Sequence, residues 1–114
     1  MTNEKDRWRL NHIVEAIEYI EEFVGNISKD KFFDDYEKQS AVIRQFEIIG
    51  ETANNLSPDF VNHYPQVNWS EVVSMRNAMI HDYFEVNIEI VWDTIKVDLP
   101  KLKSEINLIL TKIE

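Results

Sequence analysis

The chain has 114 residues, of which 44% are hydrophobic and 29% charged, a length and balance that favour one folded domain over residues 1–114 and exclude disorder. Its 21 acidic residues outnumber its 12 basic residues, and the net charge of −9 disfavours loose, sequence-independent binding to nucleic acid. The absence of cysteine excludes disulfides and thiolate metal sites. Only two glycines and three prolines are typical of helices joined by short loops.

The first residues of the chain are polar and lead into no long apolar segment. We therefore expect neither an export signal nor a membrane-spanning helix, and a cytoplasmic protein that makes no contact with a membrane. Without export, the Asn-x-Ser sequences at Asn26, Asn55 and Asn68 are expected to serve as helix caps and loop residues rather than as glycosylation sites.

Two amphipathic helices are predicted in the first half of the chain. Apolar residues recur every three or four positions over residues 6–24, with Gly25 as a stop, and again over residues 37–56. We expect the two helices to form an antiparallel hairpin, joined by a charged connection over residues 28–36. Gly50 costs about 1 kcal/mol of helix propensity relative to alanine, which indicates that another helix approaches closely at this position.

Two glutamates in the second predicted helix form a possible acidic site. Glu47 and Glu51 lie one turn apart and could bind a metal ion or act as an acid–base pair. No histidine stands near them at ligand spacing, so a salt bridge with Arg44 is the preferred interpretation. We expect no metal ion and no other cofactor.

Capping residues predict the next two helices. Ser57 followed by Pro58 is typical of a helix start, and indicates a short extra helix that ends near residue 65. Asn68 and Glu71 have the spacing of a capping box and predict the start of a third long helix. Its apolar stripe, continued along the chain, reaches Arg76, Ile80 and Tyr83.

The last predicted helix begins after Asn87 and continues to the C-terminus, with apolar residues at helical spacing. Pro100 interrupts it, because proline lacks a backbone donor and clashes with the preceding turn, so we expect a kink or short break around residues 97–99. The expected fold is all-α: a four-helix bundle of antiparallel, up-and-down helices with one short extra helix.

Reactive side chains are most concentrated in residues 75–84. Arg76 can hold a phosphate and His81 can exchange a proton near neutral pH. On a continuous helix these two residues point about 140° apart. They can meet at one phosphate only if the helix ends or bends between them, or if two copies of the chain complete one site. Asn77 lies one helical turn before His81 and can orient it. We favour a homodimer with its cleft at this segment.

This pair suits the cleavage of RNA without a metal ion. The neighbouring ribose hydroxyl attacks the phosphate, His81 performs a proton transfer and Arg76 stabilises the developing charge, leaving a cyclic phosphate end. Spacing alone leaves an alternative open: Arg76 caps a helix C-terminus or pairs with Asp82 or Glu85, and His81 is an ordinary polar residue.

The same segment resembles the HepT-type toxins of the HEPN superfamily. Their Arg-x4-His-x-Tyr signature is matched by Arg76, His81 and Tyr83. Further similarity is found in Ile48-Ile49-Gly50-Glu51, in Trp69 ahead of Met75-Arg76-Asn77, in Val91-Trp92 and in Asp98-Leu99-Pro100. The resemblance implies a HEPN-type four-helix bundle that acts as a dimeric, metal-independent endoribonuclease, with Arg76 and His81 as the catalytic pair. The supporting residues are then Asn77, Asp82 and Glu51.

The resemblance also implies the toxin half of a toxin–antitoxin system. Its partner is a minimal nucleotidyltransferase antitoxin, commonly called MntA, which adds AMP to Tyr83. AMP at this position would place bulk and negative charge beside the phosphate site and block it. Two rival interpretations remain: a catalytically inactive binding module that is the partner and modification target of the nucleotidyltransferase, and a purely structural assembly subunit in which Tyr83 packs in the core.

The remaining aromatic and histidine residues receive no catalytic role. Trp8, Trp69 and Trp92 could stack on bases, but their positions at helix starts or in apolar stripes favour the core or an interface. His12 and His63 are isolated in the sequence, and we assign them no function.

Overall fold

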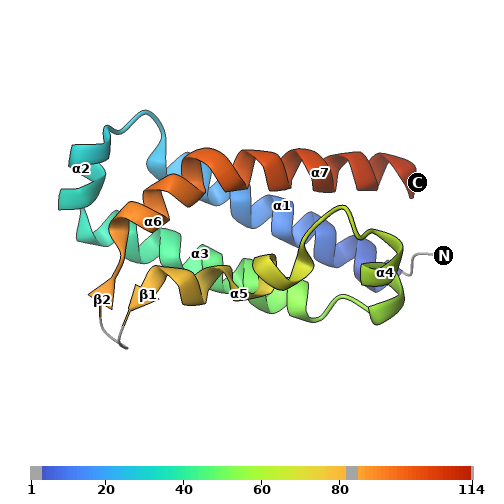
Figure 1. Ribbon diagram of the computed structural model, residues 1–114. Coiled ribbons are helices and arrows are strands. Elements are labelled where there is room, and N and C mark those ends of the chain that lie inside the picture. Colours follow the sequence, from blue (N-terminus) through green and yellow to red (C-terminus); the bar gives the residue numbers. More distant parts are fainter. Residues whose placement is uncertain (1–3, 82–84, 114) are drawn as a thin grey trace.

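The computed structural model describes residues 4–81 and 85–113, and at residues 78, 80, 81 and 85 it describes the backbone alone. Helices dominate the described chain (Figure 1). The elements are α1 (Glu4–Val24), α2 (Lys29–Asp34), α3 (Tyr36–Asn54), α4 (Pro58–His63), α5 (Trp69–Met79), β1 (Ile80–His81), β2 (Glu85–Val86), α6 (Ile88–Asp93), the π-helical turn η1 (Thr94–Asp98) and α7 (Leu99–Lys112).

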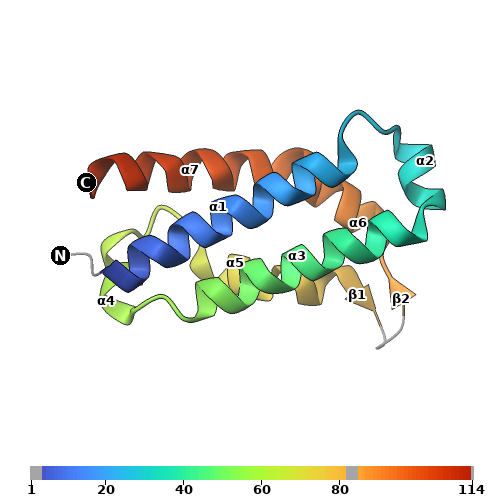
Figure 2. The same cartoon turned by 180° about the vertical axis from the view of Figure 1, so that it is seen from behind.

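The all-α bundle predicted from the sequence is confirmed. Helices α1 and α3 lie side by side and run antiparallel, α5 packs against α3, and α7 lies along α1 (Figures 1 and 2). Gly25 adopts a φ of +52° just after α1, a conformation that suits glycine and ends the helix. The charged connection over residues 28–36 contains the short helix α2.

The predicted helix caps are confirmed. Ser57 accepts the backbone N–H of Phe60 at 3.3 Å, and Asn68 accepts that of Glu71 at 3.1 Å. Asn87 caps α6 in the same way, accepting the backbone N–H of Ile90 at 3.2 Å. Each side chain satisfies a donor that the first turn of a helix leaves unpaired, which explains why these helices begin where they do.

The interruption expected at Pro100 is a π-helical turn rather than a sharp kink. Pro100 is the second residue of α7 and has no N–H to donate to the preceding turn. Immediately before it, η1 widens the helix, and the N–H of Leu99 donates to the carbonyl of Thr94 five residues back. As a result α6, η1 and α7 form one continuous helical segment (Figure 1).

The third long helix is shorter than its apolar stripe. Helix α5 ends at Met79, although the stripe in the sequence extends to Tyr83. The chain instead forms a two-stranded antiparallel ribbon in which Ile80 pairs with Val86 and His81 with Glu85. The backbone N–H of Asn87 donates to the carbonyl of Met79 at 2.6 Å. This bond from outside the helix satisfies the last carbonyl of α5 and stabilises its end.

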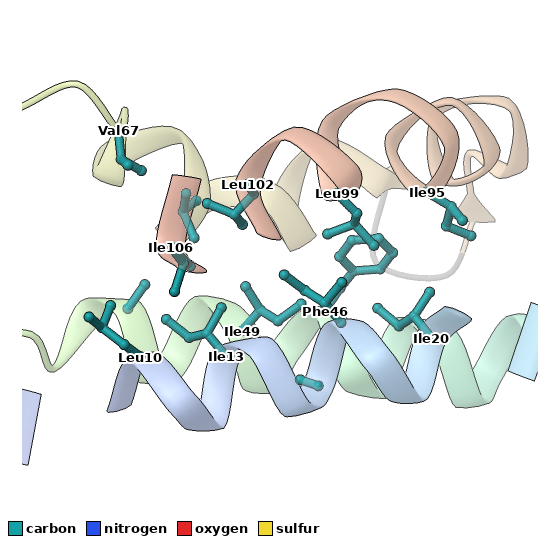
Figure 3. Close-up of a cluster of buried hydrophobic side chains, with 14 of the residues drawn as sticks. Leu10, Ile13, Ile20, Phe46, Ile49, Val67, Ile95, Leu99, Leu102 and Ile106 are labelled. Atoms are coloured by element: carbon teal, nitrogen blue, oxygen red, sulfur yellow. The ribbon is translucent and has the colours of Figure 1, made fainter. Parts of the chain in front are cut away.

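Buried apolar side chains fill the space between the helices (Figure 3). In that view, side chains of α1 and α3 face those of η1 and α7. Core members drawn there include Leu10, Ile13, Ile20, Phe46, Ile49, Leu99, Leu102 and Ile106. No helix among residues 4–81 and 85–113 is long and apolar enough to cross a membrane.

The three tryptophans have different environments. Trp69 is buried, and its indole N–H donates to the carbonyl of Tyr64 at 2.9 Å. Trp92 is half-buried against Phe32, with ring centroids 5.4 Å apart. Trp8 is 63% exposed, so of the two locations expected for it, the core is excluded and the interface stays a prediction.

Candidate functional site

Helix α5 brings Arg76 to one end of the bundle. The helix starts at the Asn68 cap, and Arg76 lies in its last turn, where a cation interacts favourably with the helix dipole. The side chain is 43% exposed, although its Nε atom is covered. The exposed area therefore belongs to the other atoms of the side chain, which solvent or a ligand can reach.

A close approach between α3 and α5 places this arginine next to a glutamate. A Cβ added to Gly50 would lie only 2.8 Å from the carbonyl oxygen of Val73, so the close approach predicted at this glycine is confirmed. Glu47 lies one turn before Gly50 on α3, and Arg76 lies one turn after Val73 on α5. Because the helices touch at Gly50, the two charged side chains can meet.

Arg76 and Glu47 form an ion pair between the two helices. Arg76 Nε lies 3.1 Å from Glu47 Oε2, and the Glu47 side chain is 29% exposed. Nε makes no hydrogen bond, so its N–H is not aligned with the carboxylate and the contact is electrostatic. The sequence suggested three other arrangements for Arg76, namely a helix cap, Asp82 or Glu85, and did not identify Glu47.

Arg44 extends this ion pair into a charged cluster. Its Nη1 atom lies 4.0 Å from Glu47 and 3.9 Å from Glu51, which confirms the salt bridge preferred for the two glutamates. Within the described residues, no group of three or more histidine, aspartate or glutamate side chains is arranged to hold a metal ion. The recorded partners of Glu47 are Arg44 and Arg76, and the recorded partner of Glu51 is Arg44.

The end of α5 lies between Arg76 and His81. The backbone turns at Met79 into the ribbon, so the 140° separation calculated for a continuous helix does not apply to these residues. For the same reason, Asn77 on α5 is not one helical turn before His81, which lies in β1. The Asn77 side chain is exposed. The first of the two solutions raised by the sequence, a helix that ends between the two residues, is realised in the backbone.

The remaining predicted site residues fall outside what the structure describes. The backbone of His81 is paired in β1, but its side chain is not among those described, and Asp82 and Tyr83 lie in the undescribed residues 82–84. Their roles stay predictions. The sequence identified Glu47 as one of two paired glutamates but missed its contact with Arg76, which depends on how α3 and α5 are aligned and has no local sequence signal.

A groove of about 480 Å³ runs beside α5 on the side formed with α6, η1 and α7. Ser74 and Met75, the residues just before Arg76, belong to its lining. Buried apolar residues form part of the lining, with polar and charged side chains alongside. The full lining is Gln66, Val67, Asn68, Glu71, Val72, Ser74, Met75, Ile90, Thr94, Asp98, Lys101, Leu102 and Glu105.

Comparisons with known proteins agree on one family. The family model described as "Ribonuclease HepT-like" matches residues 13–109. A protein of Thermococcus cleftensis named "Probable ribonuclease HepT" is 45% identical over 96 residues, which are 84% of this chain and 87% of that protein. No solved structure matches the chain.

A second relative is longer. A protein of Methanocaldococcus jannaschii, named as a gamma-glutamylcyclotransferase and candidate RNase, is 43% identical over 105 residues. The match covers 92% of this chain but only 47% of that protein, so this chain spans about half the length of that relative. A candidate RNase of Caldanaerobacter subterraneus is 39% identical, with 92% of its length covered.

Proposed function

Because the chain belongs to the ribonuclease HepT-like family, we propose that it is a metal-independent endoribonuclease in which Arg76 and His81 form the catalytic pair. The observation that carries this proposal is the end of α5 at Met79, between the two residues. A guanidinium at the helix end and an imidazole on the following strand can face one phosphate, which a continuous helix would prevent. The exposed part of Arg76 is accessible to that phosphate.

The proposed reaction is an internal transfer at an RNA phosphate. The ribose 2′-oxygen gives its proton to a base and bonds to phosphorus, the bond from phosphorus to the 5′-oxygen breaks, and that oxygen takes up a proton. The products are a 2′,3′-cyclic phosphate and a 5′-hydroxyl. His81 serves the proton transfers and Arg76 stabilises the charge on the phosphate oxygens.

We propose that the active form is a homodimer, so that two copies of His81 can supply the acid and the base. Support comes from the groove beside α5 and from exposed apolar side chains of the α6–η1–α7 segment. Ile90, which lines the groove, is 37% exposed, and Val97 and Leu108 are 67% and 57% exposed. A second copy seated in this groove would contact Ser74 and Met75, the two residues that precede Arg76 on α5.

We propose that the chain is the toxin of a toxin–antitoxin system and that a nucleotidyltransferase antitoxin of the MntA type neutralises it by attaching AMP to Tyr83. The position of Tyr83 supports this, because it is two residues after His81 and AMP there would block the site by its size and charge. Co-expression with such a nucleotidyltransferase should increase the intact mass by one or more AMP units, and Tyr83→Phe should abolish the increase.

The test of the ribonuclease function is RNA cleavage by the purified protein in the presence of EDTA. Arg76→Ala and His81→Ala should each lower the rate by about 100-fold or more, the size expected for removal of a charge-stabilising or proton-transfer group. His63→Ala, a change to an exposed histidine of α4, should keep the rate of the unchanged protein. Modification at Tyr83 without any RNA cleavage would favour the alternative, a catalytically inactive binding module.

A further inference from the structure

We propose that Glu47 is a positioning residue for Arg76, which holds the guanidinium at Nε so that the remaining part of the group meets a phosphate in a fixed orientation. The role in cleavage depends on the proposed ribonuclease function, whereas the contact itself is a property of the fold. The proposal is based on the position of Arg76 at the end of α5, where its Nε atom lies 3.1 Å from the half-buried carboxylate of Glu47 on α3.

The accessibility of the two side chains suits this role. The Nε atom of Arg76 is covered, while the side chain as a whole is 43% exposed. Glu47 thus occupies the inner part of the guanidinium and leaves its outer part open. A guanidinium has five N–H donors in a rigid plane, so that fixing one part of it orients the other donors.

The backbone places the carboxylate before any substrate arrives. The contact of Gly50 with Val73 sets the distance between α3 and α5, and Glu47 and Arg76 lie one turn beyond it on their helices. An arginine side chain without a partner loses rotamer entropy when it is fixed. Because the ion pair restricts Arg76 in the free protein, less of this entropy is lost when a phosphate binds.

Arg44 gives Glu47 a second positive neighbour. It lies 4.0 Å from Glu47, on the same helix as Gly50 and Glu51. A carboxylate alone beside Arg76 would weaken the attraction of the guanidinium for a phosphate. Arg44 offsets part of that negative charge, so Glu47 can orient Arg76 without cancelling its positive potential.

Glu37 provides a matched control for the test. It is an exposed glutamate in the first turn of α3, on the same helix as Glu47, whereas the ion pair of Arg76 recorded in the described residues is with Glu47. Glu47→Gln and Glu37→Gln each remove one negative charge and keep the size of the side chain. We expect Glu47→Gln to lower kcat for RNA cleavage about 10- to 100-fold, and Glu37→Gln to change it less than about twofold.

A second pair of variants separates positioning from a general loss of structure. If Glu47 acts through Arg76, Glu47→Gln should cause little further loss in a protein that already carries Arg76→Lys, because the group it orients is gone. A change that only disturbs the fold would lower the rate by the same factor in both backgrounds.

The chemical shift of the Arg76 Nε nitrogen, measured by NMR and assigned with Arg76→Lys, reports the nearby carboxylate charge without any activity. The shift should be the same in the unchanged protein and in Glu37→Gln, and should move in Glu47→Gln. Equal cleavage rates for the unchanged protein and Glu47→Gln would overturn the positioning role and leave the ribonuclease function standing. Absence of cleavage by the unchanged protein, with the change in chemical shift still seen in Glu47→Gln, would overturn the ribonuclease function and with it the role of Glu47 in cleavage.

Discussion

At the scale of single residues, the carboxylate of Asp6 is buried deeply for its charge. Only 1% of Asp6 is exposed, and its oxygens accept the backbone N–H of Ser57 at 3.0 Å and the Ser57 hydroxyl at 2.6 Å. The same Ser57 hydroxyl accepts the backbone N–H of Phe60. Asp6 therefore joins the start of α1 to the residue that caps α4.

We expect Asp6→Ala to lower the free energy of unfolding by about 1–3 kcal/mol, because the partly buried N–H and hydroxyl of Ser57 would lose their acceptor. Urea unfolding followed by circular dichroism measures the change. Asp59→Ala removes an exposed acidic residue from the first turn of α4 and should cost less than about 1 kcal/mol. Equal losses of unfolding free energy for the two variants would show that the hydrogen bonds of Asp6 to Ser57 do not stabilise the fold more than an exposed acidic residue does.

Lys103 is a second residue whose environment changes its chemistry. Its ammonium group donates to Glu21 at 2.9 Å and lies 3.6 Å from Glu18, so it links α7 to α1. The hydrogen bond to Glu21, together with the charges of both glutamates, raises the pKa of Lys103 above its usual value of 10.5 and outweighs the opposite effect of desolvation.

The raised pKa of Lys103 predicts a loss of stability in alkaline solution. The protonated lysine stabilises the folded protein fully below pH 10.5, and this contribution disappears as the pH rises through the higher pKa of the folded state. Lys103→Met should remove that part of the alkaline decline in the free energy of unfolding. Lys112→Met, a change on the same helix away from both glutamates, should retain it.

At the scale of elements, the distance between α3 and α5 is the feature on which the candidate site depends. A side chain on Gly50 would meet the backbone oxygen of Val73 at 2.8 Å, and a backbone atom cannot move aside without shifting its helix. Overpacking of this kind typically costs about 1–3 kcal/mol, which exceeds the gain of about 1 kcal/mol in helix propensity from alanine.

We therefore expect Gly50→Ala to lower the midpoint of thermal unfolding and to weaken RNA cleavage, because the same shift separates Glu47 from Arg76. Differential scanning calorimetry and the cleavage assay measure the two effects. Ala41→Gly, on the half-exposed part of α3, should destabilise by propensity alone and leave cleavage unchanged. A stabilised, fully active Gly50→Ala protein would contradict the close packing.

Most elements follow from local sequence, because helix periodicity and caps act over one or two turns. Ser57, Asn68 and Asn87 mark the starts of their helices, and Pro100 marks the interruption. The end of α5 does not follow in this way. Residues 76–83 keep a helical apolar pattern, and the chain leaves the helix through pairing with residues 85–87, which the pattern of α5 itself cannot indicate.

The sequence likewise predicts individual residues of the candidate site but not the contact between them. Arg76 and His81 stand out by their chemistry and spacing, and Gly50 correctly indicated a close helix. Which residue meets Arg76 depends on the alignment of α3 with α5, a tertiary property fixed where Gly50 touches Val73. Glu47 was therefore visible in the sequence only as a partner of Arg44.

At the scale of the whole molecule, the groove beside α5 and the exposed face of the α6–η1–α7 segment predict self-association. Val97→Asp should weaken the dimer at least tenfold, which corresponds to about 1.4 kcal/mol, while it barely changes the stability of the single chain because Val97 is 67% exposed. Sedimentation equilibrium measures the dimer. Tyr36→Asp, at a side chain that is 80% exposed and outside the groove lining, should leave association unchanged.

The proposed joint action of Arg76 and His81 on RNA without a metal ion is tested by the chemistry of the products formed in EDTA by the unchanged protein and by His81→Ala. We predict fragments with 2′,3′-cyclic phosphate and 5′-hydroxyl ends from the unchanged protein, and cleavage that is slower by about 100-fold or more for His81→Ala. Undiminished cleavage by His81→Ala, or fragments with 5′-phosphate ends, would show that the two residues do not cleave RNA in this way.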